Sequence, residues 1–91
     1  MTQIEFTQKE KYIIAEFIFA KECDTLCKFE VIALLPVMET HSMITNINLW
    51  RKNVNGNVKG TVETLVHLLD KHVDKDQSDS IMKEYTSSKL G

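Results

Sequence analysis

Residues 12–20 are the most apolar stretch of this 91-residue chain, and only one charged residue, Glu16, interrupts them. Wound into a helix, they direct apolar side chains to nearly every side, which is typical of a helix in the middle of a core. A short apolar run also suits a buried strand. Thr7 and Glu10 decide between the two, because they have the spacing of a capping box, in which each side chain accepts from the other residue's backbone N–H. We therefore expect a central helix over residues 8–22.

The length and composition predict one small helical domain. Hydrophobic residues make up 43% and charged residues 26% of the chain, which are ordinary values for a globular protein. One proline and three glycines leave few places for tight turns, and this favours helices over a sheet of many strands. We expect an all-α, compact bundle of four to five short helices, a single domain over residues 1–91. Within it, 1–6 should be an extended arm and 86–91 a frayed tail.

Capping residues and a proline suggest the bounds of the second helix. Asp24 or Thr25 can cap a helix over 26–34. Pro36 should end or kink it, because proline has no backbone N–H and disfavours a helical residue before it.

Apolar spacing predicts the helices that follow. Thr40 or Ser42 could open the third, whose apolar stripe is Met43, Ile47, Trp50 and Val54. The fourth has the clearest periodicity, and its apolar face is Val62, Leu65, Val66, Leu69 and Val73. A polar stretch over 76–79 caps a last short helix that contains Ile81, Met82 and Tyr85.

The Asn55-Gly56 pair leaves one structural alternative open. It suits a helix C-terminus, and it equally suits the tight turn of a hairpin. If residues 50–54 paired with 57–62, the chain would be three helices followed by a hairpin, which is the outline of an α+β winged helix. We prefer the helical bundle.

Charge is distributed unevenly along the chain. The formal net charge of −2 gives no general attraction to nucleic acid or to an anionic membrane. However, all 13 acidic residues lie outside the interval between Glu39 and Glu63, whereas three of the 11 basic residues lie inside it. This basic, amide-rich segment is the candidate partner-binding site, and its residues are Asn46, Asn48, Trp50, Arg51, Lys52, Asn53, Asn55 and Lys59.

Two kinds of partner fit these residue types. Arg, Lys and Asn read base edges and hold phosphates, although three basic residues are few for a DNA-binding protein. Trp and Arg are enriched in the hot spots of protein interfaces, which favours a protein partner. The plain structural interpretation is a solvated helix face, turn-forming asparagines and Trp50 as a core residue.

No motif indicates a metal site or catalysis. Cys23 and Cys27 lack the second ligand pair typical of structural zinc, so we expect small thiols packed at a helix junction and no metal. There is no nucleophile elbow, phosphate-binding loop or His-Glu-x-x-His sequence. We therefore expect no catalytic residues, no cofactor and no enzymatic activity.

These observations together predict a small non-enzymatic regulatory or inhibitory protein that binds a partner macromolecule, in the first place another protein. The rival is a winged-helix or helix-turn-helix DNA-binding regulator. Because the first two helices are apolar nearly all round, we also expect a homodimer or higher oligomer. No signal peptide or apolar run of ~20 residues is present, so a cytoplasmic protein without a membrane partner is expected. The abundance of Lys, Asn and Ile suggests a phage or mobile-element origin.

Overall fold

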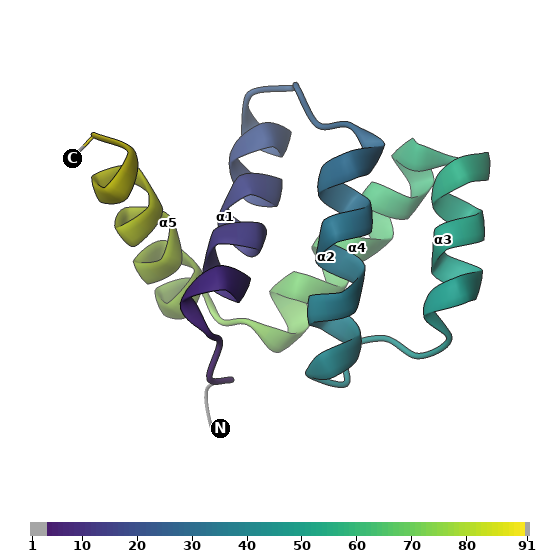
Figure 1. The fold of residues 1–91 in the computed structure, drawn as a ribbon, viewed down its shortest axis with the longest axis horizontal. Helices are drawn as coiled ribbons and strands as arrows, with labels where there is room; N and C mark the ends of the chain where they lie inside the picture. Colours follow the sequence, from purple (N-terminus) through teal and green to yellow (C-terminus); the bar gives the residue numbers. More distant parts are fainter. Residues whose placement is uncertain (1–3, 91) are drawn as a thin grey trace.

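The computed structural model describes residues 4–90, and these residues form five α-helices and no strand (Figure 1). The helices are α1 (Gln8–Glu22), α2 (Lys28–Thr40), α3 (Ile47–Gly56), α4 (Val58–His72) and α5 (Lys75–Leu90). The expectation of an all-α bundle is confirmed. The winged-helix alternative is wrong, because the residues on both sides of Asn55-Gly56 are helical.

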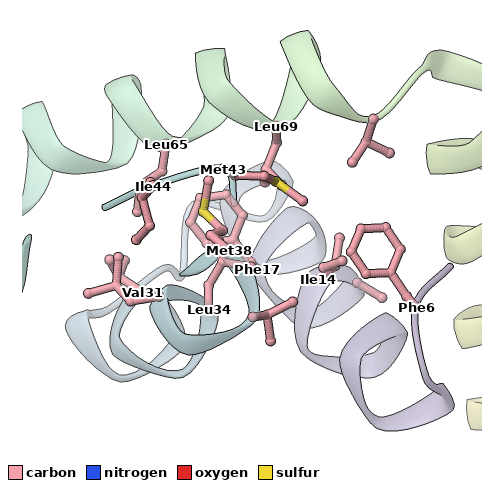
Figure 2. Packing of buried hydrophobic residues seen from close by; sticks show 14 of the residues in the cluster. Phe6, Ile14, Phe17, Val31, Leu34, Met38, Met43, Ile44, Leu65 and Leu69 are labelled. Carbon is pink, nitrogen blue, oxygen red and sulfur yellow. The ribbon is translucent and has the colours of Figure 1, made fainter. Parts of the chain in front are cut away.

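The helices are arranged in two layers. Figure 1 shows α5, α1, α2 and α3 side by side in that order, with α4 running behind them. The Cα atoms span only 19 Å along the shortest axis, compared with 37 and 31 Å along the others. α1 contacts α2 on one side and α5 on the other, and α3 contacts both α2 and α4. In Figure 2, Leu65 and Leu69 of α4 point towards Phe17 and Met38 of the other layer.

The two ends of α1 are fixed by short-range hydrogen bonds. At its start, Thr7 and Glu10 form the predicted capping box, with distances of 2.9 and 3.1 Å. At its end, the Asp24 N–H donates to the Lys21 carbonyl and the Thr25 N–H to the Ala20 carbonyl, while Asp24 adopts a φ of 56°. This is a Schellman motif. The prediction that Asp24 or Thr25 caps the second helix is therefore wrong, since both residues end the first.

The proline in α2 does not end the helix. α2 begins after Cys27 and continues through Pro36 to Thr40, so the predicted range of 26–34 is wrong at both ends. Pro36 lies on the exposed side of α2, and its missing N–H removes only the helical hydrogen bond to the Ile32 carbonyl. The last turn gains the Thr40 hydroxyl, which donates to the Pro36 carbonyl at 2.8 Å. Burial of Met38 in the core also favours continuation.

Sequence reasoning also misplaced the starts of α3 and α5. α3 begins after Asn46, whose side chain accepts from the Leu49 N–H, and neither Thr40 nor Ser42 opens it. α5 begins after Asp74, whose carboxylate accepts from the Gln77 N–H at 2.8 Å. It then extends to Leu90 and so includes most of the stretch expected to fray.

The predicted arm lies partly outside the described residues, which begin at position 4. Residues 4–7 contain neither helix nor strand. The Ile4 carbonyl accepts from the Gln77 side chain at 2.6 Å, and Phe6 is buried. This part of the arm is therefore packed against the helices.

A polar contact connects the start of α1 with the end of α2. The Glu10 Oε2 lies 3.0 Å from the His41 Nε2, and the Phe6 ring packs edge-on against the His41 ring. The Thr7 backbone N–H that donates to Glu10 holds the pKa of this carboxyl below its ordinary value. The His41 ring lowers that pKa as well. Burial raises it, but by less than the Thr7 hydrogen bond lowers it.

The first prediction concerns the core. Phe17 has no exposed surface, so replacing it with alanine leaves a void that its neighbours fill only in part. The free energy of unfolding should fall by about 3–5 kcal/mol, a large share of the roughly 5–15 kcal/mol that holds a domain together. Thermal or denaturant unfolding measures this decrease.

Arg51→Ala, at an exposed position, is the control and should change the free energy of unfolding by less than about 0.5 kcal/mol. A loss for Phe17→Ala no larger than that of the control would contradict the central position of α1.

The second prediction concerns acid stability. Because the pKa of Glu10 is lower in the folded state, its ionised form stabilises the fold above the unfolded-state pKa, and this contribution disappears as pH falls through the folded-state pKa. Glu10→Gln should therefore weaken the protein near neutral pH and make unfolding less dependent on pH in the acid range. Glu63→Gln, on the exposed side of α4, should leave the profile nearly unchanged. Identical acid profiles for Glu10→Gln and the unmodified protein would refute the assignment.

Candidate binding surface

A single residue, Asn57, connects α3 and α4. Its backbone N–H donates to the Asn53 carbonyl at 2.7 Å, and its side chain accepts from the Gly60 N–H at 3.0 Å. Asn57 therefore ends one helix and caps the next. Neither Gly56 nor Asn57 has a positive φ, so the break read from the sequence is a junction between two helices and no tight turn.

The two helices enclose an open hollow on the surface, with a volume of about 560 Å³. Its lining residues are Trp50, Lys52, Asn53, Gly56, Asn57, Gly60, Thr61 and Thr64. None of these residues carries a carboxylate. We call this site the α3–α4 hollow.

Trp50 occupies the inner edge of the hollow. It is half-buried and packs against the core, so the structural and the functional interpretations of this residue are compatible. Within residues 4–90 the indole N–H has no hydrogen-bond partner. The side chains of Lys52 and Asn53 are exposed at the same site, and Lys52 forms no ion pair with any described residue. The hollow thus presents an indole, an amide and an ammonium group, all of which donate hydrogen bonds.

The structure brings only part of the predicted site together. Trp50, Lys52 and Asn53 line the hollow. Asn48, Arg51 and Asn55, three exposed residues at helical spacings of three and four, lie on another flank of α3. The Arg51 guanidinium donates to the Asn48 side chain at 3.4 Å.

The other two predicted residues lie apart from the hollow. Asn46 has a structural role, because it caps α3 with a φ of 49°. Lys59 is exposed on α4, and Glu63 follows it by four residues on the same face. Its surroundings are therefore less basic than the sequence interval suggested.

Sequence reasoning missed the residues that α4 contributes. Gly56, Gly60 and Thr64 recur at intervals of four, which was the available signal for a line of small residues across the junction. The Thr61 hydroxyl donates to the Asn57 carbonyl at 2.8 Å and the Thr64 hydroxyl to the Gly60 carbonyl at 3.1 Å. Thr64 is exposed, so its hydroxyl oxygen can still accept a hydrogen bond from a partner, whereas Thr61 is buried.

The two cysteines are not packed as expected. Cys23 and Cys27 are both exposed in the connection between α1 and α2. The Cys27 thiol donates to a Glu30 carboxylate oxygen at 2.7 Å. The described residues contain no group of three His, Cys, Asp or Glu side chains placed to hold a metal ion.

No protein-family model, curated protein or solved structure matches this chain. Over the described residues, every helix is too short or too polar to cross a membrane. Function is therefore inferred from the chemistry of the surface itself.

The third prediction uses the two glycines of the hollow as a matched pair. A Cβ at Gly56 would have no atom within 4 Å, so Gly56→Ala should raise the free energy of unfolding by about 0.4–1 kcal/mol. A Cβ at Gly60 would lie 3.0 Å from the side-chain nitrogen of Asn57, which caps α4. Gly60→Ala should therefore raise the free energy of unfolding by less than Gly56→Ala does, or lower it. Denaturant unfolding of both variants measures the difference, and a greater stability for Gly60→Ala would contradict the geometry of the junction.

Proposed function

We propose that this chain is a small non-enzymatic regulatory protein that acts by binding another protein, and that the α3–α4 hollow receives an acidic segment of that partner. The observation that carries the proposal is the set of unpaired donors in the hollow. The Trp50 indole N–H and the Lys52 ammonium group both lack acceptors within residues 4–90, and no lining residue is acidic. Tryptophan at the edge of a core is also a residue type enriched in binding hot spots.

The charge of the remaining chain supports a local acidic segment over a long polyanion. Outside the interval between Glu39 and Glu63 there are 13 acidic and eight basic residues. A short carboxylate-bearing segment would contact the hollow alone, whereas an extended polyanion would also meet this acidic body. Lys52 is the only cation among the lining residues, which is a small footprint for a phosphate backbone.

The connections between the helices also favour a protein partner. A DNA-binding helix-turn-helix joins its two helices through a turn of three or four residues. Here the connection from α2 to α3 runs over residues 41–46, and that from α3 to α4 is Asn57 alone. We therefore propose a protein partner for a regulator acting in the reducing cytoplasm, where two exposed thiols persist.

The fourth prediction tests this site with a defined probe. Isotope-labelled protein is titrated with a capped hexa-glutamate peptide and followed by NMR. We expect shifts of the Trp50 indole N–H and of backbone amides over residues 50–64, weakening as salt is added. Lys52→Glu should weaken binding about tenfold, because it removes a charge-assisted hydrogen bond.

The controls separate a local site from general charge attraction. Lys59→Glu makes the same change of charge on another face of α4 and should weaken binding much less. A hexa-lysine peptide should not shift the NMR signal of the Trp50 indole N–H. Equal losses for Lys52→Glu and Lys59→Glu would contradict the site, and tighter, steeply salt-dependent binding of duplex DNA to the same residues would favour the rival function.

A further inference from the structure

The face of α1 and α2 that lies opposite α4 is not covered by any helix of the described chain (Figure 1). Phe29 of α2 and Phe19 of α1 are 70% and 44% exposed, and both line a surface hollow to which α4 contributes no residue. Phe29, Ala33 and Pro36 follow one another at helical spacing along α2, and all three are exposed. An exposed apolar stripe of this kind on a small domain indicates an interaction surface. We call it the Phe29 face.

This hollow lies directly beside Phe29, which forms part of its rim and is the most exposed large apolar side chain of the described residues. It has a volume of about 340 Å³, and α1, α2 and α5 all contribute to its lining. Its apolar walls are Phe19, Ala20, Ala33 and Tyr85, and the rings of Phe19 and Tyr85 have centroids 6.0 Å apart. One face therefore carries both an apolar projection and an apolar hollow. A surface that is complementary to itself in this way suits a two-fold symmetric pair of identical chains.

The Phe29 face carries equal numbers of cations and carboxylates, so two copies can meet there without net repulsion. Lys28 lies next to the projection, with its Nζ 5.8 Å from the centroid of the Phe29 ring. Glu16, Glu30 and Lys89 lie at the hollow, and the Lys89 Nζ is 5.2 Å from the centroid of the Tyr85 ring. Lys28 and Glu30 form no ion pair with another residue of the described chain, whereas Glu16 faces Lys89. In a two-fold pair that seats each Phe29 in the opposite hollow, Lys28 of one copy comes close to carboxylates of the other.

We propose that the Phe29 face binds a second copy of this chain, with Phe29 of each copy seated in the hollow of the other. The dimer buries the largest exposed apolar side chain and brings opposite charges together at its rim. It leaves the α3–α4 hollow free, because that hollow is formed by different helices. This inference does not depend on the proposed function, although two linked hollows would bind a repeated partner more tightly than one.

The fifth prediction is tested by analytical ultracentrifugation at increasing protein concentration. The unmodified chain should show a concentration-dependent dimer. Phe29→Asp should raise the dissociation constant at least about tenfold, because it removes the central apolar anchor. Leu49→Asp is the matched control: Leu49 is 51% exposed but lies on α3, so this variant should dimerise as the unmodified chain does. Circular dichroism verifies that both variants remain helical.

A charge exchange tests the orientation of the two copies. Lys28→Glu should weaken the dimer, and adding Glu16→Lys and Glu30→Lys to that variant should restore it. Three results would overturn the proposal: an unmodified chain that stays monomeric at every concentration, a Phe29→Asp variant that dimerises undiminished, or a dimer lost in Leu49→Asp alone. Failure of the charge exchange to restore the dimer would overturn the seating of Phe29 in the hollow.

Discussion

The burial of α1 is the constraint on which the rest of the structure depends. Its residue Phe17 has no exposed surface, and the helix is flanked by α2 and α5 while α4 passes across the layer. A helix that is apolar on nearly every side must be surrounded in this way, because exposed apolar surface is unfavourable in water. Four other helices do not cover it fully, however. Phe19 remains 44% exposed, and with Phe29 it forms the face for which we propose a second copy.

The elements specified by local interactions could be predicted from the sequence. The bounds of α1 agree with those predicted from its capping box. The apolar face of α4 agrees with the helical spacing of its apolar residues, and Leu65, Leu69 and Val73 are buried. Errors arose where tertiary packing overrides local preference. Pro36 does not end α2, because its missing N–H falls on the exposed side and burial of Met38 beyond it favours a longer helix. The cysteines were expected to be buried because of their residue type, yet the connection that contains them lies on the surface.

The candidate site was identified only in part, for a geometric reason. Charge along the sequence selects an interval, but the side chains that meet depend on how two helices are rotated about their axes. Trp50 and Lys52 reach the hollow, whereas Arg51, between them in sequence, lies on a different flank of α3. Thr61 and Thr64 could not be selected by charge, because they are neutral and belong to the next helix. The asparagines of the segment also have different roles, and two of them, Asn46 and Asn57, serve as helix caps.

Stability and the proposed binding belong to different parts of the molecule. α1 holds the core, and the α3–α4 hollow carries the unpaired donors. Trp50 is the only tryptophan of the chain and lines the hollow, so a segment that binds there changes the surroundings of the only indole. The most direct measurement is therefore its emission during titration with hexa-glutamate. We expect a saturable shift of the emission maximum that becomes smaller as salt is added. An emission spectrum that stays unchanged while the peptide binds would contradict the assignment of the α3–α4 hollow as the binding site.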